Sequence, residues 1–566
     1  MGLRTTNLAK LDGGDFDVLI VGAGINGAVS AASLAARGLS VALIDRGDFA
    51  GFTSMESSNL VWGGFKYLEN YEIGLVRNLC VSRNHLMKAY PANVKEIRFL
   101  ATLDQHSPYK PWFAALGATA YWMIGNAFTK PPALLSPRGI VAREPVVDID
   151  TALGGIEYSD AYIVDNDARF VFGFVRSALN SGAAVANYVE LLDATRGPDG
   201  WVAQLRDTDA GRDFQLTAKV VINCAGPFVD GLNDKLGITT KHSIVMSKGI
   251  HLLVPRIAGQ ERVLAFYDDT ERLFYVIPMG PRSCIGTTDD RVDTAYTEVT
   301  DGDRDFLLDQ INARLQLDEP LTPDDIISSR CGVRPLVVEG GGEGTETKDW
   351  TSLSRKHAME VDKSKKFITI FGGKLTDCVN VGNEVARAVG RLGLKLERDR
   401  KSWYGEPPKA TKTEFFRQAR LMHLDKLRQR ASFETLSTRL WRRYGLRAFA
   451  MLEAIRDDPT MANDIIAGAE YVRVELYYAA QTEMITTLDD FLRRRSKIAL
   501  VLSYEEIREA EGIHEACRLL FGDEAQKRYD EYFTPEREAA VTKLREPDAK
   551  FPGHPQAQDS GLPAAG

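Results

Sequence analysis

The sequence predicts an α/β protein divided into several domains, and three observations support this. The chain has 566 residues, more than a single hydrophobic core usually supports. Residues 16–44 are typical of a buried strand, a glycine-rich turn, a helix and a second strand. Residues 408–545 carry a helical period with charge pairs four residues apart. We therefore expect a Rossmann-like dinucleotide-binding domain, an inserted α+β domain and a C-terminal helical domain.

Composition places the chain among ordinary globular proteins and excludes several classes. Hydrophobic residues make up 44% and charged residues 26%. The net charge of -8 is spread without long blocks of like charge, so no nucleic-acid surface is expected. The cysteines form no CxxC pair, and no metal site is expected. The N-terminus lacks an apolar leader and no apolar run is long enough to cross a bilayer, which favours a cytoplasmic protein.

The glycine-rich turn after the first strand is the strongest local signal. In its pattern, Gly22-x-Gly24-x-x-Gly27, the glycines permit a tight turn, a close approach to a pyrophosphate, and packing of helix on strand. The helix start presents free N–H groups to an anion. Asp45 ends the second strand 18 residues after Gly27, where a carboxylate can accept from an adenosine ribose hydroxyl. The expected dinucleotide contacts here are Gly22, Gly24, Ile25, Asn26, Gly27, Asp45 and Arg46.

Three further segments favour FAD over a nicotinamide cofactor, because distant parts of the chain have to surround a bound flavin. The first follows the second strand and offers hydroxyl groups to the pyrophosphate and ribityl chain. The second, residues 219–226, is a buried strand that ends in small residues. The third, residues 367–390, is a strand, a double-glycine turn and a helix whose start can face the flavin pyrimidine. The expected contacts are Thr53, Ser54, Ser57, Ser58, Asn59 and Leu60, then Ala225 and Gly226, then Gly373, Lys374, Leu375 and Thr376.

Motifs along the chain resemble those of the FAD-dependent glycerol-3-phosphate dehydrogenases and the related glycerophosphate oxidases. They include VGAGINGA, TSMESSNLVWGGFKYLE, NCAGPFVD, GVRPL and FGGKLTD, in that order, and residues 469–500 resemble the family's C-terminal domain. The resemblance implies an FAD-binding domain of the glutathione-reductase or D-amino-acid-oxidase type. It also implies oxidation of glycerol 3-phosphate or a related phosphorylated polyol by hydride transfer to flavin N5, with quinone or oxygen as electron acceptor. Two alternatives stay open: oxidation of a non-phosphorylated hydroxy or amino acid, and a divergent member with little turnover.

The sequence departs from this family beside the flavin. The family usually has a histidine at the position of Trp62 and an arginine at that of Lys66. Indole has one N–H donor and no acceptor nitrogen, so Trp62 cannot be the base that takes the hydroxyl proton. Our first candidate for that role is Lys66 with Tyr67 adjacent, and His251 is another. Trp62 is either an aromatic wall over the substrate face of the flavin, which predicts a bulkier substrate, or a core residue beneath the ring.

Two cations match the family motifs residue for residue. Arg334 in GVRPL and Lys374 in FGGKLT correspond to cations that the family associates with the substrate anion and the flavin. We expect Arg334 to be the main anion contact, with a structural ion pair as the alternative. Asp377 follows FGGKLT where the family commonly reads Thr-Tyr-Arg, and a structural role in the first turn of a helix is expected for it.

The expected FAD-binding domain spans residues 15–400 as three segments, about 15–100, 155–230 and 330–395, with a substrate domain in about 100–155 and 230–330. The helical domain covers 408–545, and 546–566 is predicted to be a disordered tail. Residues 110–135, the most apolar aromatic run, predict either a membrane-surface contact or a buried helix. The contact would place the protein peripherally on the inner face of the cell membrane. The oligomeric state is left open, with a homodimer as the candidate.

Overall fold

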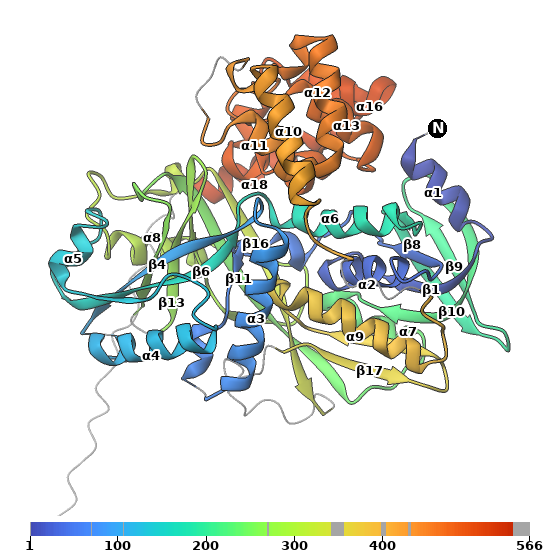
Figure 1. Cartoon of the computed structure of the whole chain (residues 1–566), viewed down its shortest axis with the longest axis horizontal. Coiled ribbons are helices and arrows are strands. Elements are labelled where there is room, and N and C mark those ends of the chain that lie inside the picture. The colour runs from blue at the N-terminus through green and yellow to red at the C-terminus, as the bar shows by residue number, and fades with distance from the viewer. Residues whose placement is uncertain are drawn as a thin grey trace, which may run out of the picture.

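The computed structural model describes residues 2–69, 71–105, 107–268, 271–340, 356–397, 403–427 and 432–546. Figure 1 shows two sheet-containing parts side by side and a helical part that covers one end of both. The predicted tail lies outside the described residues except for Glu546. A short helix that the sequence analysis did not predict, α1 (Leu3–Leu11), precedes the first strand.

The first sheet is the predicted Rossmann-like unit. At its centre β1 (Asp15–Val21) pairs in parallel with β2 (Val41–Ile44) and with β10 (Arg212–Asn223), and β10 pairs in parallel with β18 (Phe367–Phe371). The strand order is β17-β18-β10-β1-β2-β7, with β8 and β9 continuing from β10. The remaining strands are β7 (Ala184–Ala186), β8 (Val189–Arg196), β9 (Trp201–Asp207) and β17 (Ala358–Asp362).

Small side chains allow the helix that follows the glycine-rich turn, here called the fingerprint helix, to lie within this part of the fold. The helix α2 (Ile25–Ala35) packs against α6 (Asp167–Asn180) and α9 (Cys378–Arg391). Every residue of α2 from Gly27 to Ala35 is buried, and most are alanine or serine. Such residues let helices approach closely without leaving large polar groups unpaired.

The second sheet has the order β15-β11-β14-β13-β12-β4-β6-β3, with β16 beside β11 and β5 beside β6. Among the described strands its pairs are antiparallel except for β12 with β4. The long strands β4 (Val94–Asp104), β6 (Ala152–Ile163) and β16 (Ser328–Glu339) come largely from ranges assigned above to the FAD-binding segments. The domain boundaries themselves stay a prediction. The other strands are β3 (Leu60–Val61), β5 (Ala133–Leu135), β11 (His242–Pro255), β12 (Arg262–Tyr267), β13 (Leu273–Met279), β14 (Arg282–Gly286) and β15 (Asp290–Val292).

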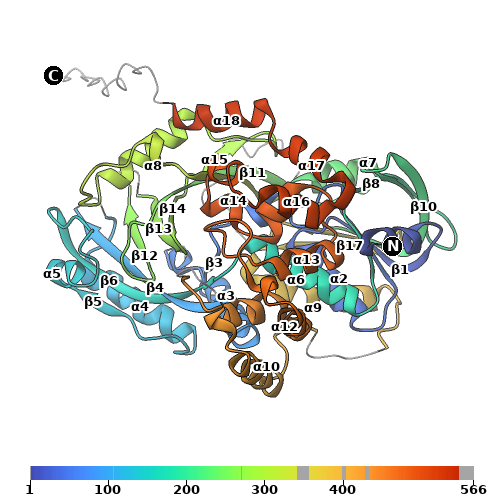
Figure 2. The same cartoon turned by 90° about the horizontal axis from the view of Figure 1, so that it is seen from above.

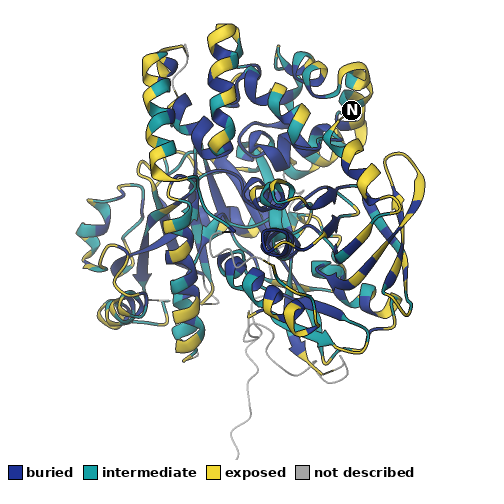
Figure 3. Cartoon of the chain, turned by 45° about the vertical axis from the view of Figure 1, so that its right-hand side comes forward, coloured by how far each residue is buried: buried dark blue, intermediate teal, exposed yellow. Residues whose placement is uncertain are grey.

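The C-terminal part is helical, as predicted. Its longer helices are α10 (Lys409–Leu421), α11 (Leu436–Tyr444), α12 (Ala448–Asp457), α13 (Arg473–Thr482), α16 (Ile513–Phe521), α17 (Ala525–Tyr532) and α18 (Pro535–Arg545). Two short helices, α14 (Ile498–Val501) and α15 (Tyr504–Arg508), and a π-helix, η11 (Asp490–Arg495), complete this part; η11 contacts α6, and α14 contacts β16. In Figure 3 the exposed residues gather on the outer faces of this part and the buried ones where it meets the sheets.

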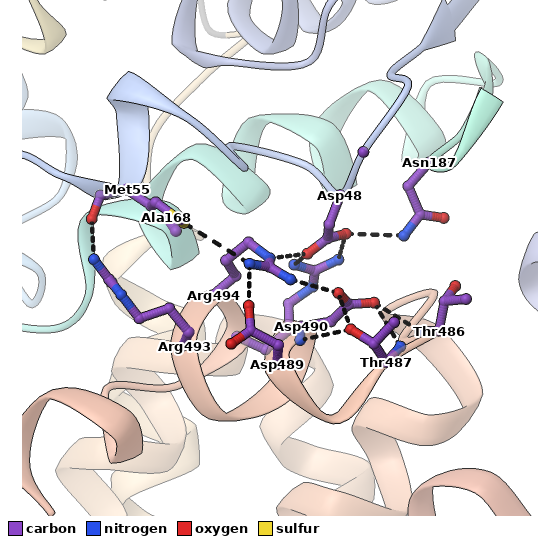
Figure 4. Close-up of polar contacts among 12 residues, drawn as sticks. Asp48, Met55, Ala168, Asn187, Thr486, Thr487, Asp489, Asp490, Arg493 and Arg494 are labelled. Carbon is purple, nitrogen blue, oxygen red and sulfur yellow. Dashed lines mark hydrogen bonds and ion pairs between the residues drawn. The ribbon is translucent and has the colours of Figure 1, made fainter. Parts of the chain in front are cut away.

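Buried ion pairs fasten this helical part to the dinucleotide-binding part (Figure 4). The guanidinium of Arg495 binds both carboxylate oxygens of Asp48, at 2.7 and 2.8 Å, and Nε of Arg494 donates to the same carboxylate at 2.8 Å. All three side chains are at least nine-tenths buried. Burial alone would raise the pKa of Asp48, but the two arginines hold it below its ordinary value. The two parts are therefore joined by charges that are almost fully buried.

Candidate active site

The turn between β1 and α2 has the geometry of an anion cradle. Gly22 has a φ of 98°, and a Cβ there would lie 2.5 Å from the carbonyl oxygen of Cys224. A Cβ on Gly27 would lie 1.8 Å from the Gly22 oxygen, so both positions require glycine. The helix begins at Ile25 after Gly24, which has no side chain to cap the first turn. Ser54 accepts from the N–H of Ile25, so the next N–H groups of the first turn, those of Asn26 and Gly27, are the ones that can face a phosphate.

Asp45 and Arg46 border this cradle at the end of β2. The Asp45 carboxylate accepts from the backbone N–H of Ala23 at 2.6 Å and of Gly47 at 2.9 Å. Burial raises the pKa of Asp45 to about 6. Arg46 lies with its guanidinium 3.9 Å from the ring centroid of Phe228. Asp45 therefore fixes the fingerprint turn in addition to the ribose contact expected for it.

The segment after β2, residues 53–64, carries hydroxyl groups that fall into two sets with different partners. Ser54 accepts from the N–H of Ile25 at 3.0 Å and so reaches the cradle, while Thr53 donates to the carbonyl of Val333 at 2.6 Å. Ser57 instead donates to Asp167 at 2.7 Å. Only the beginning of this segment therefore lies against the fingerprint helix.

Asn59 belongs with Ser57 to a buried network. Its Nδ2 donates to the carbonyls of Ile163 at 3.2 Å and Asp165 at 2.5 Å, and Arg330 donates to its Oδ1 at 3.0 Å. Arg330 also bonds the Ser57 carbonyl and lies 3.4 Å from Asp167. Ser58 is half-buried and Leu60 opens strand β3, so cofactor contacts of these two residues stay a prediction.

The third predicted segment joins the cradle through its double glycine. Gly372 has a φ of 58° and Gly373 one of 104°. Nδ2 of Asn26 donates to the Gly372 carbonyl at 2.9 Å, and a Cβ on Gly373 would lie 3.5 Å from Oδ1 of Asn26. After Leu375, the buried Thr376 donates to the carbonyl of Trp62 at 3.3 Å. The double-glycine turn therefore contacts both the fingerprint helix, through Asn26, and the segment that carries Trp62. In the second segment, the backbone N–H of Ala225 donates to Oδ1 of Asn223 at 3.0 Å, and Gly226 has a φ of 58°.

Lys374, Tyr67 and Trp62 form a cationic and aromatic group beside this turn. Nζ of Lys374 donates to the Tyr67 hydroxyl and lies 4.1 Å from the Tyr67 ring centroid and 5.5 Å from that of Trp62. The Trp62 and Tyr67 rings are 5.6 Å apart. Lys66 has a different neighbourhood, since its charge acts on Glu69. The residue placed against the Tyr67 hydroxyl is Lys374, 307 positions away, and not its sequence neighbour.

Arg334 lies on β16 opposite Ser247 of β11. Its Nη1 is 3.1 Å from Asp289 and its Nη2 donates to the Thr287 hydroxyl at 2.8 Å. The guanidinium lies flat on Gly249, where a Cβ would be 2.1 Å from Nη2. The ion pair considered as the alternative is therefore present, and the side chain is still 27% exposed, which leaves a face for an anion.

His251 lies on β11, four positions beyond Ser247, and is paired with Arg330 of β16. Burial and the charges of Arg330 and Arg334 lower its pKa to about 3, so the imidazole is neutral at ordinary pH. Its Nδ1 is buried without a hydrogen-bond partner among the described residues. A neutral ring of this kind can accept a hydrogen bond but is a weak proton acceptor.

Two features of the site have no counterpart in the sequence analysis. His357 lies behind Gly373, between Asp377 at 3.0 Å and Glu384 at 2.8 Å. No spacing rule links these residues. Arg330 could have been found, because strand alternation places it on the same face of β16 as Arg334.

The residues present fit an adenine dinucleotide. The cradle has room only for glycine, the N-cap residue Gly24 has no capping side chain of its own, and Oδ1 of Asn26 is buried without a hydrogen-bond partner among the described residues. A cation, Lys374, stands beside aromatic rings at the adjoining turn. The fold and this site together define a class of protein, the Rossmann-like oxidoreductases that use a bound dinucleotide.

Comparison with known proteins narrows the class to a family. Residues 17–349 match the model for FAD dependent oxidoreductases, and residues 417–527 match the C-terminal domain of alpha-glycerophosphate oxidase. The chain belongs to the FAD-dependent oxidoreductases, within the glycerol-3-phosphate dehydrogenase family. The resemblance, the fold class and the FAD cofactor inferred from the sequence are confirmed.

Individual relatives cover nearly the whole chain. A glycerol-3-phosphate dehydrogenase of Pseudomonas tolaasii is 30% identical over 503 residues, which are 87% of this chain and 93% of that protein. A D-erythritol 1-phosphate dehydrogenase of Brucella abortus is 28% identical over 87% of this chain and 96% of its own. Among solved structures, glycerol-3-phosphate dehydrogenase from Bacillus halodurans complexed with FAD has a TM-score of 0.70 at 22% identity, covering 97% of this chain and 99% of its own.

Proposed function

We propose that this protein is an FAD-dependent dehydrogenase that oxidises a phosphorylated polyol, glycerol 3-phosphate or a larger relative, to the keto phosphate. The observation that carries the proposal is the similarity to two kinds of polyol-phosphate dehydrogenase over 87% of the chain. Bound FAD would supply the acceptor for the hydride that leaves the alcohol carbon. The hydroxyl oxygen on the same carbon also has to lose its proton, and a protein group has to accept that proton.

The geometry supports one assignment of these roles. The exposed face of the Arg334 guanidinium suits the phosphate, because Asp289 and Thr287 fix its plane from the other side. Tyr67 suits the proton, because the ammonium of Lys374 at its hydroxyl stabilises the negative charge that develops when the phenol oxygen loses its own proton to solvent. This assignment prefers Lys374 over Lys66 as the cation that acts with Tyr67. His251 is neutral and orients the substrate in this scheme rather than taking the proton.

Trp62 supports a substrate larger than glycerol 3-phosphate. Its ring packs against Tyr67 and under Lys374, so it forms one side of the place where the alcohol has to lie. Its indole N–H is buried beside the Tyr158 hydroxyl and makes no well-formed hydrogen bond among the described residues, so this donor can turn to an extra hydroxyl of a longer polyol. This feature favours a four-carbon or five-carbon polyol phosphate over the three-carbon compound.

Anaerobic mixing of the FAD-loaded protein with a panel of substrates tests the proposal. The panel contains glycerol 3-phosphate, erythritol phosphate, a pentitol phosphate, the unphosphorylated polyols, and hydroxy and amino acids, and the readout is bleaching of the flavin absorbance. Rapid bleaching by a phosphorylated polyol, with at least tenfold slower bleaching by its unphosphorylated form, is the expected result. Bleaching by hydroxy or amino acids alone would refute it, and so would no bleaching by any compound.

The helix α4 (Pro111–Ile124) supports a membrane quinone as the electron acceptor. Its outward side chains Trp112, Phe113, Leu116 and Met123 are 58%, 51%, 60% and 60% exposed. Aromatic and aliphatic side chains of this kind insert at a membrane–water interface. Among the described helices none is both long and apolar enough to cross a membrane. A peripheral position on the inner face of the membrane, and a homodimer, accordingly belong to the proposal.

A further inference from the structure

A cavity of about 460 Å³ lies where the helical part, the second sheet and the segment after β2 meet. One wall is the segment Met55–Glu56, the floor is the start of β16, and the outer walls are α15, η11 and α18. Figure 2 shows α15 and α18 running close to one another, and ion pairs of 2.8 and 3.0 Å join them. The volume is that of a small-molecule site, and junctions between domains are where such sites occur.

The cavity has an apolar body and a charged end. Its apolar lining comes from Ile326, Ile327, Leu502, Val541 and Leu544. At the other end Arg493 pairs with Glu56 and Arg537 with Asp489, each at 2.9 Å, while Arg545 donates to the Ile326 carbonyl and pairs with Glu505 at 3.0 Å. The lining therefore combines paired charges with a surface that favours hydrocarbon.

Polar atoms at the charged end are buried without hydrogen-bond partners among the described residues. They are Nη1 of Arg493, Oε2 of Glu56 and the hydroxyl of Tyr504. The Arg493 side chain is 9% exposed and Tyr504 is 6% exposed. The second terminal nitrogen of Arg493 is engaged, since it donates to the Met55 carbonyl at 2.7 Å (Figure 4) and lies 2.9 Å from Glu56. Buried polar groups are normally paired, so the two donors, Nη1 of Arg493 and the Tyr504 hydroxyl, point to a missing acceptor, whereas Oε2 of Glu56 is itself an acceptor.

We propose that this cavity binds a small organic carboxylate with a compact apolar body. The carboxylate meets Nη1 of Arg493 and the Tyr504 hydroxyl, two donors that suit its two oxygens. The body of the ligand lies between β16 and α18 against the aliphatic lining. Nothing in the reaction proposed above requires this second site, so its occupancy is independent of flavin reduction.

The position of the site makes it an effector site. Arg493 holds the backbone of Met55, and two residues earlier Thr53 bonds the carbonyl of Val333 while Ser54 caps the fingerprint helix at Ile25. A ligand that binds Arg493 therefore contacts the residue that holds Met55, and the segment Thr53–Met55 borders the dinucleotide cradle. A carboxylate that binds here changes how that segment is held, and through it the affinity for FAD.

Isothermal titration calorimetry of the FAD-loaded full chain tests the proposal with defined probes. Benzoate and hexanoate carry both the anion and the apolar body, whereas acetate lacks the body and benzyl alcohol lacks the anion. We expect saturable binding of one benzoate or hexanoate per chain, at least tenfold tighter than either truncated probe. Absence of saturable binding by both carboxylates would overturn the proposal.

Variants locate the binding. Leu544→Trp fills the cavity from the last helix and should abolish it, while Lys543→Trp, at an exposed position on the same helix, should bind as the parent does. Tyr504→Phe keeps the shape and removes one donor, so binding should weaken about tenfold. Binding that survives both Leu544→Trp and Tyr504→Phe would lie elsewhere, for example in the flavin site, and would refute the assignment. Tyr504→Phe decides the question even if the tryptophan variant does not fold.

Discussion

Nδ1 of His357 lies 3.0 Å from the carboxylate of Asp377, and this contact crosses directly behind the double-glycine turn of the active site. The turn carries Lys374, and Asp377 also accepts from the Ser82 hydroxyl at 3.1 Å and the Asn380 amide at 2.6 Å. Asp377 provides one of two carboxylates that hold a buried imidazole, so its structural role is a specific one.

This arrangement predicts a pH-dependent stability. Burial lowers the pKa of His357, but hydrogen bonds and charges from Asp377 and Glu384 outweigh it and raise the pKa above its ordinary value of 6.5. Protonated His357 therefore stabilises the folded state. This contribution is complete when the pH is below the ordinary pKa of histidine, and it is lost as the pH rises through the raised pKa of His357. His357→Gln should lower the free energy of unfolding by about 1–2 kcal/mol in mild acid and by less in alkali. Denaturant unfolding at both pH values measures this, and an equal loss at the two would contradict it.

Arg334 should control the affinity for the phosphorylated substrate. Arg334→Lys keeps the charge but loses the planar fork that Thr287 and Asp289 hold in place. We expect kcat/KM for flavin reduction to fall about 10- to 100-fold, mainly through KM. FAD content, measured by absorbance, should stay unchanged. An unaltered KM would show that the anion binds elsewhere.

Tyr67 should control the chemical step. Tyr67→Phe removes the hydroxyl that Lys374 contacts and keeps the ring that packs on Trp62. Loss of the proton acceptor should slow flavin reduction about 10²- to 10⁴-fold with little change in substrate affinity. Lys66→Met is the matched control and should retain most of the rate. The reverse result, a slow Lys66→Met and a normal Tyr67→Phe, would restore Lys66 as the main candidate.

Asp48 should be essential for the attachment of the helical part. Asp48→Asn removes the carboxylate that pairs with the buried guanidinium of Arg495, at a cost of about 3–5 kcal/mol, while Arg494 keeps its ion pairs with Asp489 and Asp490. Thermal unfolding or soluble yield measures the loss. Asp213→Asn breaks an exposed ion pair with Arg206 and should cause no measurable change. Similar behaviour of the two variants would contradict a role for burial.

The exposed face of α4 should bind membranes. Trp112→Glu places a charge at the N-terminal end of that face, where Trp112 is 58% exposed. Sedimentation with liposomes should show binding by the parent protein and about tenfold less by the variant, with equal flavin reduction in solution. Retained binding would assign the membrane contact to another surface.

The parts of this protein that local sequence determines were predictable. Gly22 and Gly27 are required by backbone contacts within a single strand–turn–helix unit, and the helix start they produce follows from the same residues. The pairing of Lys374 with Tyr67 was not predictable, because it depends on how two segments 307 residues apart are brought together. The same reason applies to His357. Ser57 and Asn59 were assigned to the cofactor on composition, whereas Asp167 and Arg330 engage them in a buried network.

The contact between Asp48 and Arg495 also bears on how the chain is made. Asp48 lies only four residues beyond β2, but its counter-charge is 447 positions later in the sequence. A nascent chain that has completed every strand of the first sheet still lacks the residue that neutralises this carboxylate. The nucleotide-binding half therefore reaches its final form only after the ribosome has delivered nearly the entire polypeptide, and a truncation before residue 495 removes a partner from the beginning of the protein.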